Sequence, residues 1–393
     1  MPTSNQELFD AYIRHQTYIL RTATWLRNQA SKILAAGDPA LGDLILATVA
    51  RMENVELSSQ TGQRMMRDFE EKLIKLRREP WGEVADLYDE NLIRIATSEV
   101  AWAAATFQQS VPVLLDMKTV PPAQMRRIVR ANPYQGRTMS EWLTSAAGTE
   151  SAEILRRTKV GIADGMQPRD VARSVLGAAS EGGAGGTTIR SMQHAETIAI
   201  TLTNGITSEA REQFYVENTD VINTEIFLAT LDGNTTPECV ENDQELYKVG
   251  EGPMPPLHPR CRSLRIPYAD AELLGNRPFK PTTEGMLIQE YAEANGLKSN
   301  LRKRDSLPRG HKGKFDEYAR GRTRELIGQV EGRTPYPEWF GTQSAAFKSD
   351  YLGPSRYAIY KDLSEPKQRE FMRSLSNQFG RPYTVDQLES QWG

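Results

Sequence analysis

Residues 227–267 read FLATLDGNTTPECVENDQELYKVGEGPMPPLHPRCRSLRIP and contain the most specific pattern in this chain. Just before and into this stretch, Thr224–Thr230 is rich in β-prone residues and predicts a strand. Two further strand-like stretches follow, at 245–249 and 262–267. We therefore expect a small β-rich insert at about 221–268.

The rest of the chain is expected to be helical. Apolar residues recur at three- and four-residue intervals over 8–33 and predict one amphipathic helix. Gly37, which can take a positive φ, and Pro39, which cannot continue a helix, predict its end. Further helices are expected at about 41–76 and 81–109. The predicted fold class is α+β and predominantly α, with a helical bundle or arms, the β-rich insert and a helical, partly irregular C-terminal tail.

The length of 393 residues predicts several domains, because one hydrophobic core rarely organises so long a chain. We expect an N-terminal helical region (1–120), a second helical region (121–220), the β-rich insert (221–268), a helix with a basic connector (269–324) and a C-terminal helical segment (325–393). The glycine-rich run at 178–188 lacks the Lys-Ser/Thr ending of a phosphate-binding loop and is interpreted as a connector.

The composition is that of a soluble protein, with 39% hydrophobic and 25% charged residues. The first ten residues contain no apolar run, so we expect no secretory signal. No stretch approaches the ~18 uncharged apolar residues of a membrane span. We therefore expect a soluble protein that is made in a cytoplasm.

Positive charge gathers between Lys298 and Arg324, where ten basic residues face three acidic ones although the whole chain carries −3. This basic segment suits a phosphate backbone or an acidic protein surface, and the alternative is a solvated connector. Its only aromatic residues are Phe315 and Tyr318, which favours phosphate contact without sequence readout. The candidate contact residues are Lys298, Arg302, Lys303, Arg304, Arg309, Lys312 and Lys314.

The order of motifs in 227–267, hereafter the cassette, resembles the Mu F-like head-morphogenesis family of tailed phages. An A-T-L-D strand (229–232) is followed by a T-x-x-C turn (236–239) and a P-P-L-H-P-x-C-R return segment (255–262). The C-terminal part resembles the family's W-x-x-x-Q and L-G-x-x-R signature at Trp339, Gln343, Gly353 and Arg356. The likeness covers about residues 120–393.

Two departures accompany this resemblance. Where the family often has an Arg-Thr-Glu triplet, this chain has Ile200-Thr201-Leu202-Thr203. Some members carry four cysteines in the cassette, whereas here Thr236 and Ser263 occupy two of those positions.

The resemblance implies a minor head protein of the virion, located near the portal vertex and acting in capsid assembly and DNA packaging or ejection. Portal and capsid proteins would be its partners, packaged DNA a further one, and neither a membrane nor a small-molecule substrate is implied. We expect structural roles and no catalysis for the cassette residues Asp232, Thr235, Cys239, Asp243, Pro256, His258, Cys261 and Arg262. Asp232 and Thr235 should organise the turn, and the prolines should stiffen the return segment.

Cys239, His258 and Cys261 offer three zinc ligands at plausible spacing, but a tetrahedral site needs a fourth. The sequence therefore favours a protein without a cofactor, in which the cysteines are buried neighbours or form a disulfide under stress. Zinc is the alternative.

A metal-dependent nuclease or a nucleic-acid-binding protein that uses the cassette is the alternative function. Nuclease chemistry needs a general base apart from the metal ligands, and the cassette holds one histidine, His258. The other histidines are His15, His194 and His311. The expected function is accordingly binding rather than catalysis.

Overall fold

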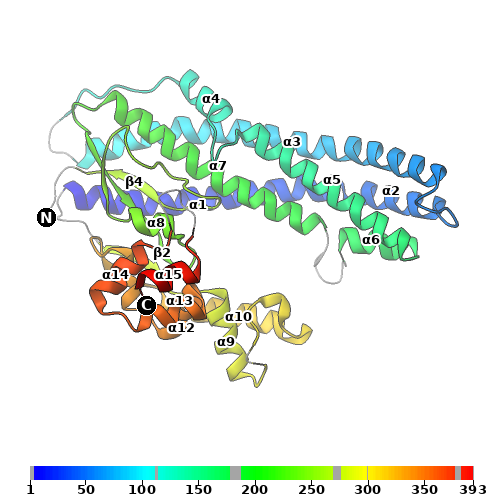
Figure 1. Ribbon diagram of the computed structural model, residues 1–393. Coiled ribbons are helices and arrows are strands. Elements are labelled where there is room, and N and C mark those ends of the chain that lie inside the picture. Colours follow the sequence, from blue (N-terminus) through cyan, green and yellow to red (C-terminus); the bar gives the residue numbers. More distant parts are fainter. Residues whose placement is uncertain are drawn as a thin grey trace.

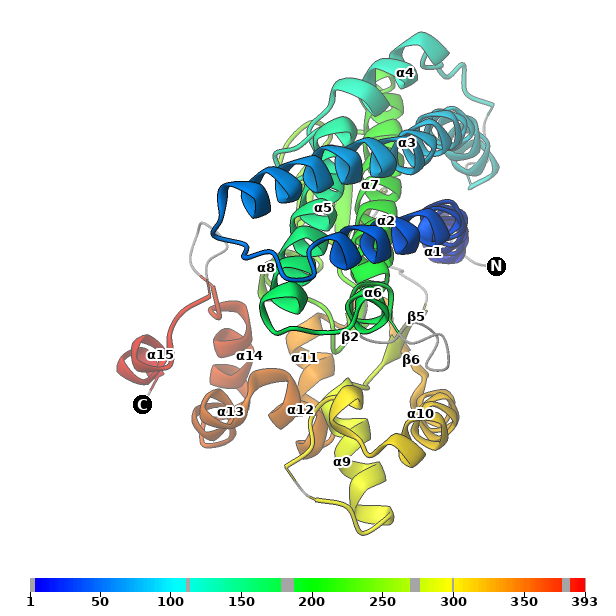
Figure 2. The ribbon, with the colours of Figure 1, turned by 90° about the vertical axis from the view of Figure 1, so that its right-hand side faces the viewer.

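The computed structural model describes residues 4–110, 114–177, 187–268, 276–298, 300–376 and 382–392. A long helical part leads to the β-rich insert, and the C-terminal helices form a second body beside it (Figures 1 and 2). The predicted class, α+β and predominantly α, is confirmed. Most of the glycine-rich run at 178–188 lies outside the described residues.

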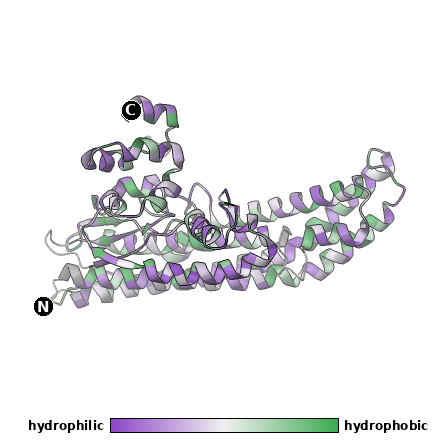
Figure 3. Cartoon of the chain, turned by 90° about the horizontal axis from the view of Figure 1, so that it is seen from below, coloured by the Kyte–Doolittle hydropathy of each residue, from purple (hydrophilic) through white to green (hydrophobic). Residues whose placement is uncertain are grey.

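The helical part consists of α1 (Ser4–Ala36), α2 (Asp38–Arg51), α3 (Gln60–Ser110), α4 (Pro122–Ala131), α5 (Met139–Ala163), α6 (Pro168–Leu176) and α7 (Thr187–Glu217). Helices α1, α3, α5 and α7 pack along one another. At ~1.5 Å per residue, α3 alone is about 75 Å long. Hydrophobic and hydrophilic residues alternate along these helices (Figure 3), as expected where one face of each helix is buried.

Gly37 lies between α1 and α2, but it does not adopt the positive φ that was predicted. Its φ is −83°, in the right-handed region, so its capacity for positive φ is not used. An added Cβ would lie 2.9 Å from Arg77 Nη1 and 3.3 Å from Pro80 Cγ. Glycine is needed here because α3 passes close by.

Helix α3 continues through Pro80, whereas the sequence predicted a break between residues 76 and 81. An interior proline loses one backbone hydrogen bond and costs about 3 kcal/mol. Leu73 and Trp81 on either side are buried, and burying such side chains contributes roughly 1.5–3 kcal/mol each. Packing therefore outweighs the proline, and the interruption lies instead at residues 52–59.

A buried ion pair lies at the centre of the helical part. Arg77 donates to both carboxylate oxygens of Glu150, at 2.7 and 3.0 Å. Trp81 Nε1 and Ser191 Oγ donate to the same carboxylate, each at 2.7 Å. Arg77 also donates to the Leu34 carbonyl at 3.2 Å. Four helices, α1, α3, α5 and α7, are thereby linked at one satisfied polar site.

The predicted strands of the insert are confirmed. They form an antiparallel sheet in the order β3-β1-β4, made of β1 (Thr224–Leu228), β3 (Leu246–Lys248) and β4 (Leu264–Pro267). A second sheet, which the sequence did not predict, has the order β2-β5-β6 and consists of β2 (Leu231–Asp232), β5 (Asn276–Lys280) and β6 (Gly328–Glu331). It joins the cassette to the C-terminal body.

The C-terminal body contains α9 (Glu284–Ala294), η2 (Arg304–Ser306), η3 (Arg309–His311), α10 (Lys312–Leu326), α11 (Tyr336–Gly341), α12 (Ala345–Leu352), α13 (Pro354–Lys361), α14 (Glu365–Arg373) and α15 (Val385–Trp392). Together with β2 and α8 (Pro237–Asn242) of the cassette, it encloses its own hydrophobic core. The basic connector expected up to Arg324 is a regular helix from Lys312 onward, because Phe315 is buried and Tyr318 and Ala319 pack beside it, which holds α10 against α9.

One stretch of the described residues, Glu7–Arg51, is long and apolar enough to span a membrane by length and composition alone. A buried core helix passes the same test. Leu26 and Leu34 of α1 and Leu41 and Ile45 of α2 are all buried in the helical part. Of the apolar 18-residue window in this stretch, 33% is buried.

Candidate metal centre in the cassette

Polar side chains of α7 hold the return segment of the cassette in place. Asn204 Nδ2 donates to the carbonyl oxygens of Cys261 and Ser263, at 3.0 and 3.1 Å. The Arg260 backbone N–H donates to Thr201 Oγ1 at 2.9 Å. Thr201 belongs to the stretch that departs from the family's charged triplet. A neutral hydroxyl therefore makes this contact to the return segment.

Pro256 fixes the same segment from its other end. It is buried, and its carbonyl oxygen accepts a hydrogen bond from Gln135 Nε2 at 2.6 Å. An added Cβ at Gly205 of α7 would lie 3.0 Å from Pro256 Cδ and 2.4 Å from Tyr134 Cδ1. The lack of a side chain at Gly205 thus lets the proline and Tyr134 approach the helix.

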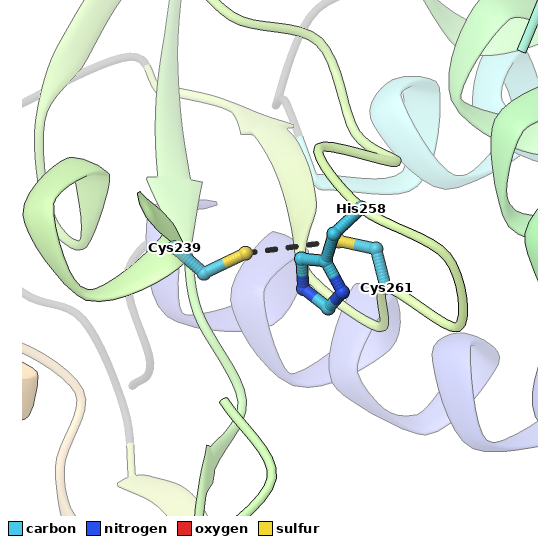
Figure 4. A group of neighbouring side chains, drawn as sticks. All are labelled: Cys239, His258 and Cys261. Carbon is cyan, nitrogen blue, oxygen red and sulfur yellow. Dashed lines mark hydrogen bonds between the residues drawn. The ribbon is translucent and has the colours of Figure 1, made fainter. Parts of the chain in front are cut away.

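Three side chains of the cassette lie close together beside this segment: Cys239, His258 and Cys261 (Figure 4). Cys239 is presented by α8, and the other two residues come from the return segment. The two sulfur atoms are 3.7 Å apart, and the three candidate ligand atoms all lie within 4.8 Å of one another. Both cysteines are buried, free thiols, and His258 is half-buried. These three residues could hold a metal ion.

The thiols and the imidazole perturb one another strongly. The hydrogen bond between the sulfurs, together with His258, holds the pKa of Cys261 well below its usual value. The same sulfur–sulfur contact and burial raise the pKa of Cys239. Burial alone would lower the pKa of His258, but its hydrogen bond to Cys261 raises it above the ordinary value.

Asp232 organises the turn that precedes α8. Its Oδ1 accepts from the Asn234 backbone N–H at 2.9 Å and lies 3.3 Å from Thr235 Oγ1. Thr235 Oγ1 also donates to the Thr230 carbonyl. Arg262 binds both carboxylate oxygens of Asp232, so the turn and the return segment are joined by a bidentate ion pair.

Asp243 is a fully buried carboxylate of the cassette, and each of its oxygens accepts two hydrogen bonds. It accepts from the backbone N–H groups of Ala229 and Tyr336, each at 2.8 Å. Arg277 donates to both of its oxygens, at 2.9 and 3.0 Å, and also donates to the Ala229 carbonyl. All of this is buried. Arg277 was not identified from the sequence, since it lies 34 positions from Asp243 and outside any motif.

Two tyrosines of the C-terminal body complete the attachment. Tyr336 Oη donates to the Asp232 carbonyl and Tyr351 Oη to the Thr235 carbonyl, each at 2.8 Å. The turn of the cassette is thus held from both sides, by the return segment and by the C-terminal body.

The C-terminal signature residues lie inside the second body rather than at the metal cluster. Trp339 is fully buried, and Gln343 Nε2 donates to its carbonyl at 2.8 Å. Gly353 has a φ of +77° between α12 and α13, a conformation that favours glycine. Arg356 donates to the Tyr383 carbonyl at 2.9 Å. These residues position the helices of that body.

The basic segment begins after α9 with Lys298 and continues through η2, η3 and α10. Arg304 forms a bidentate pair with Asp316 at 2.7 Å, and Lys312 lies 4.0 Å from Asp305. Acidic neighbours therefore offset part of the positive charge of the basic segment. Of the candidate contact residues, Lys298, Arg302, Lys303, Arg309 and Lys314 are exposed, and Arg302 also donates to the Leu301 carbonyl at 2.8 Å.

A groove of about 1030 Å³ runs between α3 and α5, on the helical part. Ile74, Trp81 and Leu143 contribute apolar surface, and Gly82 and Gly148 also line it. Its lining includes neither histidine nor cysteine. The groove is thus chemically distinct from the Cys/His cluster, and it was not predicted from the sequence.

No protein-family model, curated protein or solved structure matches this chain.

Proposed function

We propose that this chain is a minor head protein of a tailed phage, present in the host cytoplasm during assembly and in the virion near the portal vertex. It acts in capsid assembly and in DNA packaging or ejection by binding portal and capsid proteins. The observation that carries the proposal is the cassette, whose ordered set of motifs resembles the Mu F-like family. No catalytic step is part of the proposed role.

The geometry of the cassette supports a structural role. Asp232, Thr235 and Asp243 all direct their polar groups at backbone or at arginines of the chain itself. Such a set of contacts holds the turn, the return segment and strand β5 together. A substrate would need polar groups that remain open to it, and these three residues are occupied by the fold.

The groove between α3 and α5 supports the binding of a partner helix. An added Cβ at Gly82 or Gly148 would meet nothing within 4 Å, so neither glycine is required by contacts within the described residues. Glycine inside a helix is nevertheless unfavourable by about 1 kcal/mol relative to alanine. The close approach of a partner helix would explain why both positions are glycine. A portal helix is the occupant we propose.

The nuclease alternative is less well supported. His258 Nδ1 donates to the Pro259 carbonyl at 2.9 Å, so one ring nitrogen is already engaged. His15 is bound to Glu99 at 2.7 Å and His311 lies 3.1 Å from Tyr291 Oη, each outside the cassette. A nuclease needs a base as well as metal ligands, and His258 can serve as only one of these.

The proposal is tested by immunoprecipitation of the chain from phage-infected cells and by analysis of purified particles. We expect the portal protein in the precipitate and a few copies of the chain in each particle. Isolation of the chain from infected cells without portal or capsid protein, together with its absence from particles, would contradict the proposal. Cleavage of plasmid DNA by purified chain, lost in His258→Ala, would support the nuclease instead.

A further inference from the structure

The cassette brings together three side chains of the types that bind metal ions: Cys239, His258 and Cys261. The chain has two cysteines and four histidines in 393 residues. Both cysteines and one histidine meet within 4.8 Å, from two segments that are separated by a strand and a glycine-containing loop. Thiolate and imidazole are the ligands that select zinc over calcium or magnesium.

We propose that Cys239, His258 and Cys261 bind one Zn²⁺ ion, with a solvent molecule as the fourth ligand. Two sulfurs bound to a tetrahedral zinc at ~2.3 Å are about 3.8 Å apart. The observed separation of 3.7 Å already matches that edge. A sulfur and an imidazole nitrogen on the same ion would be about 3.6 Å apart. The half-buried imidazole therefore needs to move by only about 1 Å to complete the set.

The surroundings of the cluster orient its ligands as a metal site requires. His258 Nδ1 donates to the Pro259 carbonyl, which leaves Nε2 to bind the ion. Asn204 holds the Cys261 and Ser263 carbonyls against α7, so the return segment is fixed before metal arrives. Histidine ligands in zinc proteins commonly carry such a hydrogen bond on the second nitrogen.

The proposed fourth ligand position of the zinc ion lies near two hydroxyl groups. The hydroxyls of Thr236 and Ser263 both lie beside the Cys239 sulfur. Thr236 Oγ1 is buried and has no hydrogen-bond partner among the described residues. Because His258 is half-buried, solvent can enter from its side. A cysteine at position 236 would place a third thiolate next to the site.

A disulfide is the competing explanation for paired cysteines. Its sulfurs would be about 2.05 Å apart, whereas these are 3.7 Å apart and both thiols are free. A disulfide would also give no role to His258. The zinc site is independent of the proposed role in the phage head, since either could hold without the other.

The test uses the full chain, purified with a reducing agent, stripped with a chelator and titrated with Zn²⁺ alone. Bound metal is measured by mass spectrometry, and Co²⁺ serves as a spectroscopic probe of thiolate coordination. We expect one zinc per chain in the unmodified protein and none in Cys239→Ser or Cys261→Ser. His258→Ala should weaken binding by at least about tenfold. Circular dichroism reports whether each variant is folded.

Thr236→Cys keeps the inference testable even if the cysteine variants fail to fold. This variant should bind zinc at least about tenfold more tightly than the unmodified chain, while the matched control Thr236→Ser should not. Zinc uptake by the reduced, folded protein that does not exceed uptake by Cys261→Ser would overturn the proposal. So would a Thr236→Cys variant that binds no more tightly. In either case portal association would be unaffected, which separates this failure from that of the proposed function.

Discussion

Asp243 of the cassette and Arg277 of β5 form a fully buried ion pair. Removing the aspartate leaves a buried guanidinium without its counter-charge and leaves two backbone N–H groups unpaired. We expect Asp243→Ala to lower the free energy of unfolding by about 3–5 kcal/mol. Asp316→Ala, which breaks the partly exposed Arg304 pair, should lower it by less than about 1 kcal/mol. Urea denaturation of both variants measures the difference, and equal losses would contradict this assignment.

Glu153 gives a residue-scale prediction for pH. Hydrogen bonds from Arg156 and Arg157 lower its pKa from 4.5 to about 2. A carboxylate whose pKa is lowered in the folded state stabilises above its unfolded pKa and loses that effect as pH falls through the folded value. The stability difference between the unmodified chain and Glu153→Gln should therefore shrink between pH about 5 and about 2. Thermal midpoints across this range measure it; a constant difference would refute the prediction.

At the scale of single residues, the cassette residues could be predicted from the sequence, but few of their hydrogen-bond partners could. Cys239, His258 and Cys261 were found because their types and spacing are specific. Arg277 and Asn204 were missed, since an arginine in a strand and an asparagine in a helix are common and their partners are distant. Ligand types can be read from a linear pattern, whereas buried pairs depend on the packing of distant elements.

Helices α3 and α5 carry the element-scale prediction. Gly82 and Gly148 are helical, and an added Cβ meets nothing within 4 Å at either position. Gly82→Ala and Gly148→Ala should each raise the free energy of unfolding of the isolated chain by about 0.5–1 kcal/mol. The matched control is Gly161→Ala in α5, where the new Cβ would lie 2.7 Å from Val171 Cγ2. That variant should lose about 1–3 kcal/mol in chemical denaturation. Stabilisation at all three positions would refute the prediction.

Element types were predicted more successfully than element ends. The strands of the insert follow from local β-prone residues, and the structure confirms them. Gly37 marks the end of α1 as predicted, although its φ of −83° is not the positive value expected. Pro80 gave a wrong boundary because packing outweighs local propensity there. Strands β5 and β6 escaped prediction because each is stabilised by pairing with a segment about 50 residues away.

At the scale of the whole molecule, the helical part and the C-terminal body meet at the cassette (Figure 1). The groove lies on the helical part, between α3 and α5, whereas the metal cluster lies in the cassette. Partner binding and metal binding are therefore separable by mutation. A bound zinc ion would make the cassette more rigid, and a portal helix would bind in the groove of the helical part.

Gly148→Leu tests this separation. Open space at Gly148 means that the larger side chain projects into the groove without a clash inside the chain. We expect zinc content and thermal midpoint close to those of the unmodified protein, but at least tenfold less portal protein in the precipitate, because burial of a partner against the groove needs close approach there. Cys261→Ser should give the reverse pattern if it folds, with metal lost and portal retained. Undiminished portal binding by Gly148→Leu would remove the groove from the proposed contact and leave the cassette face as the surface to test next.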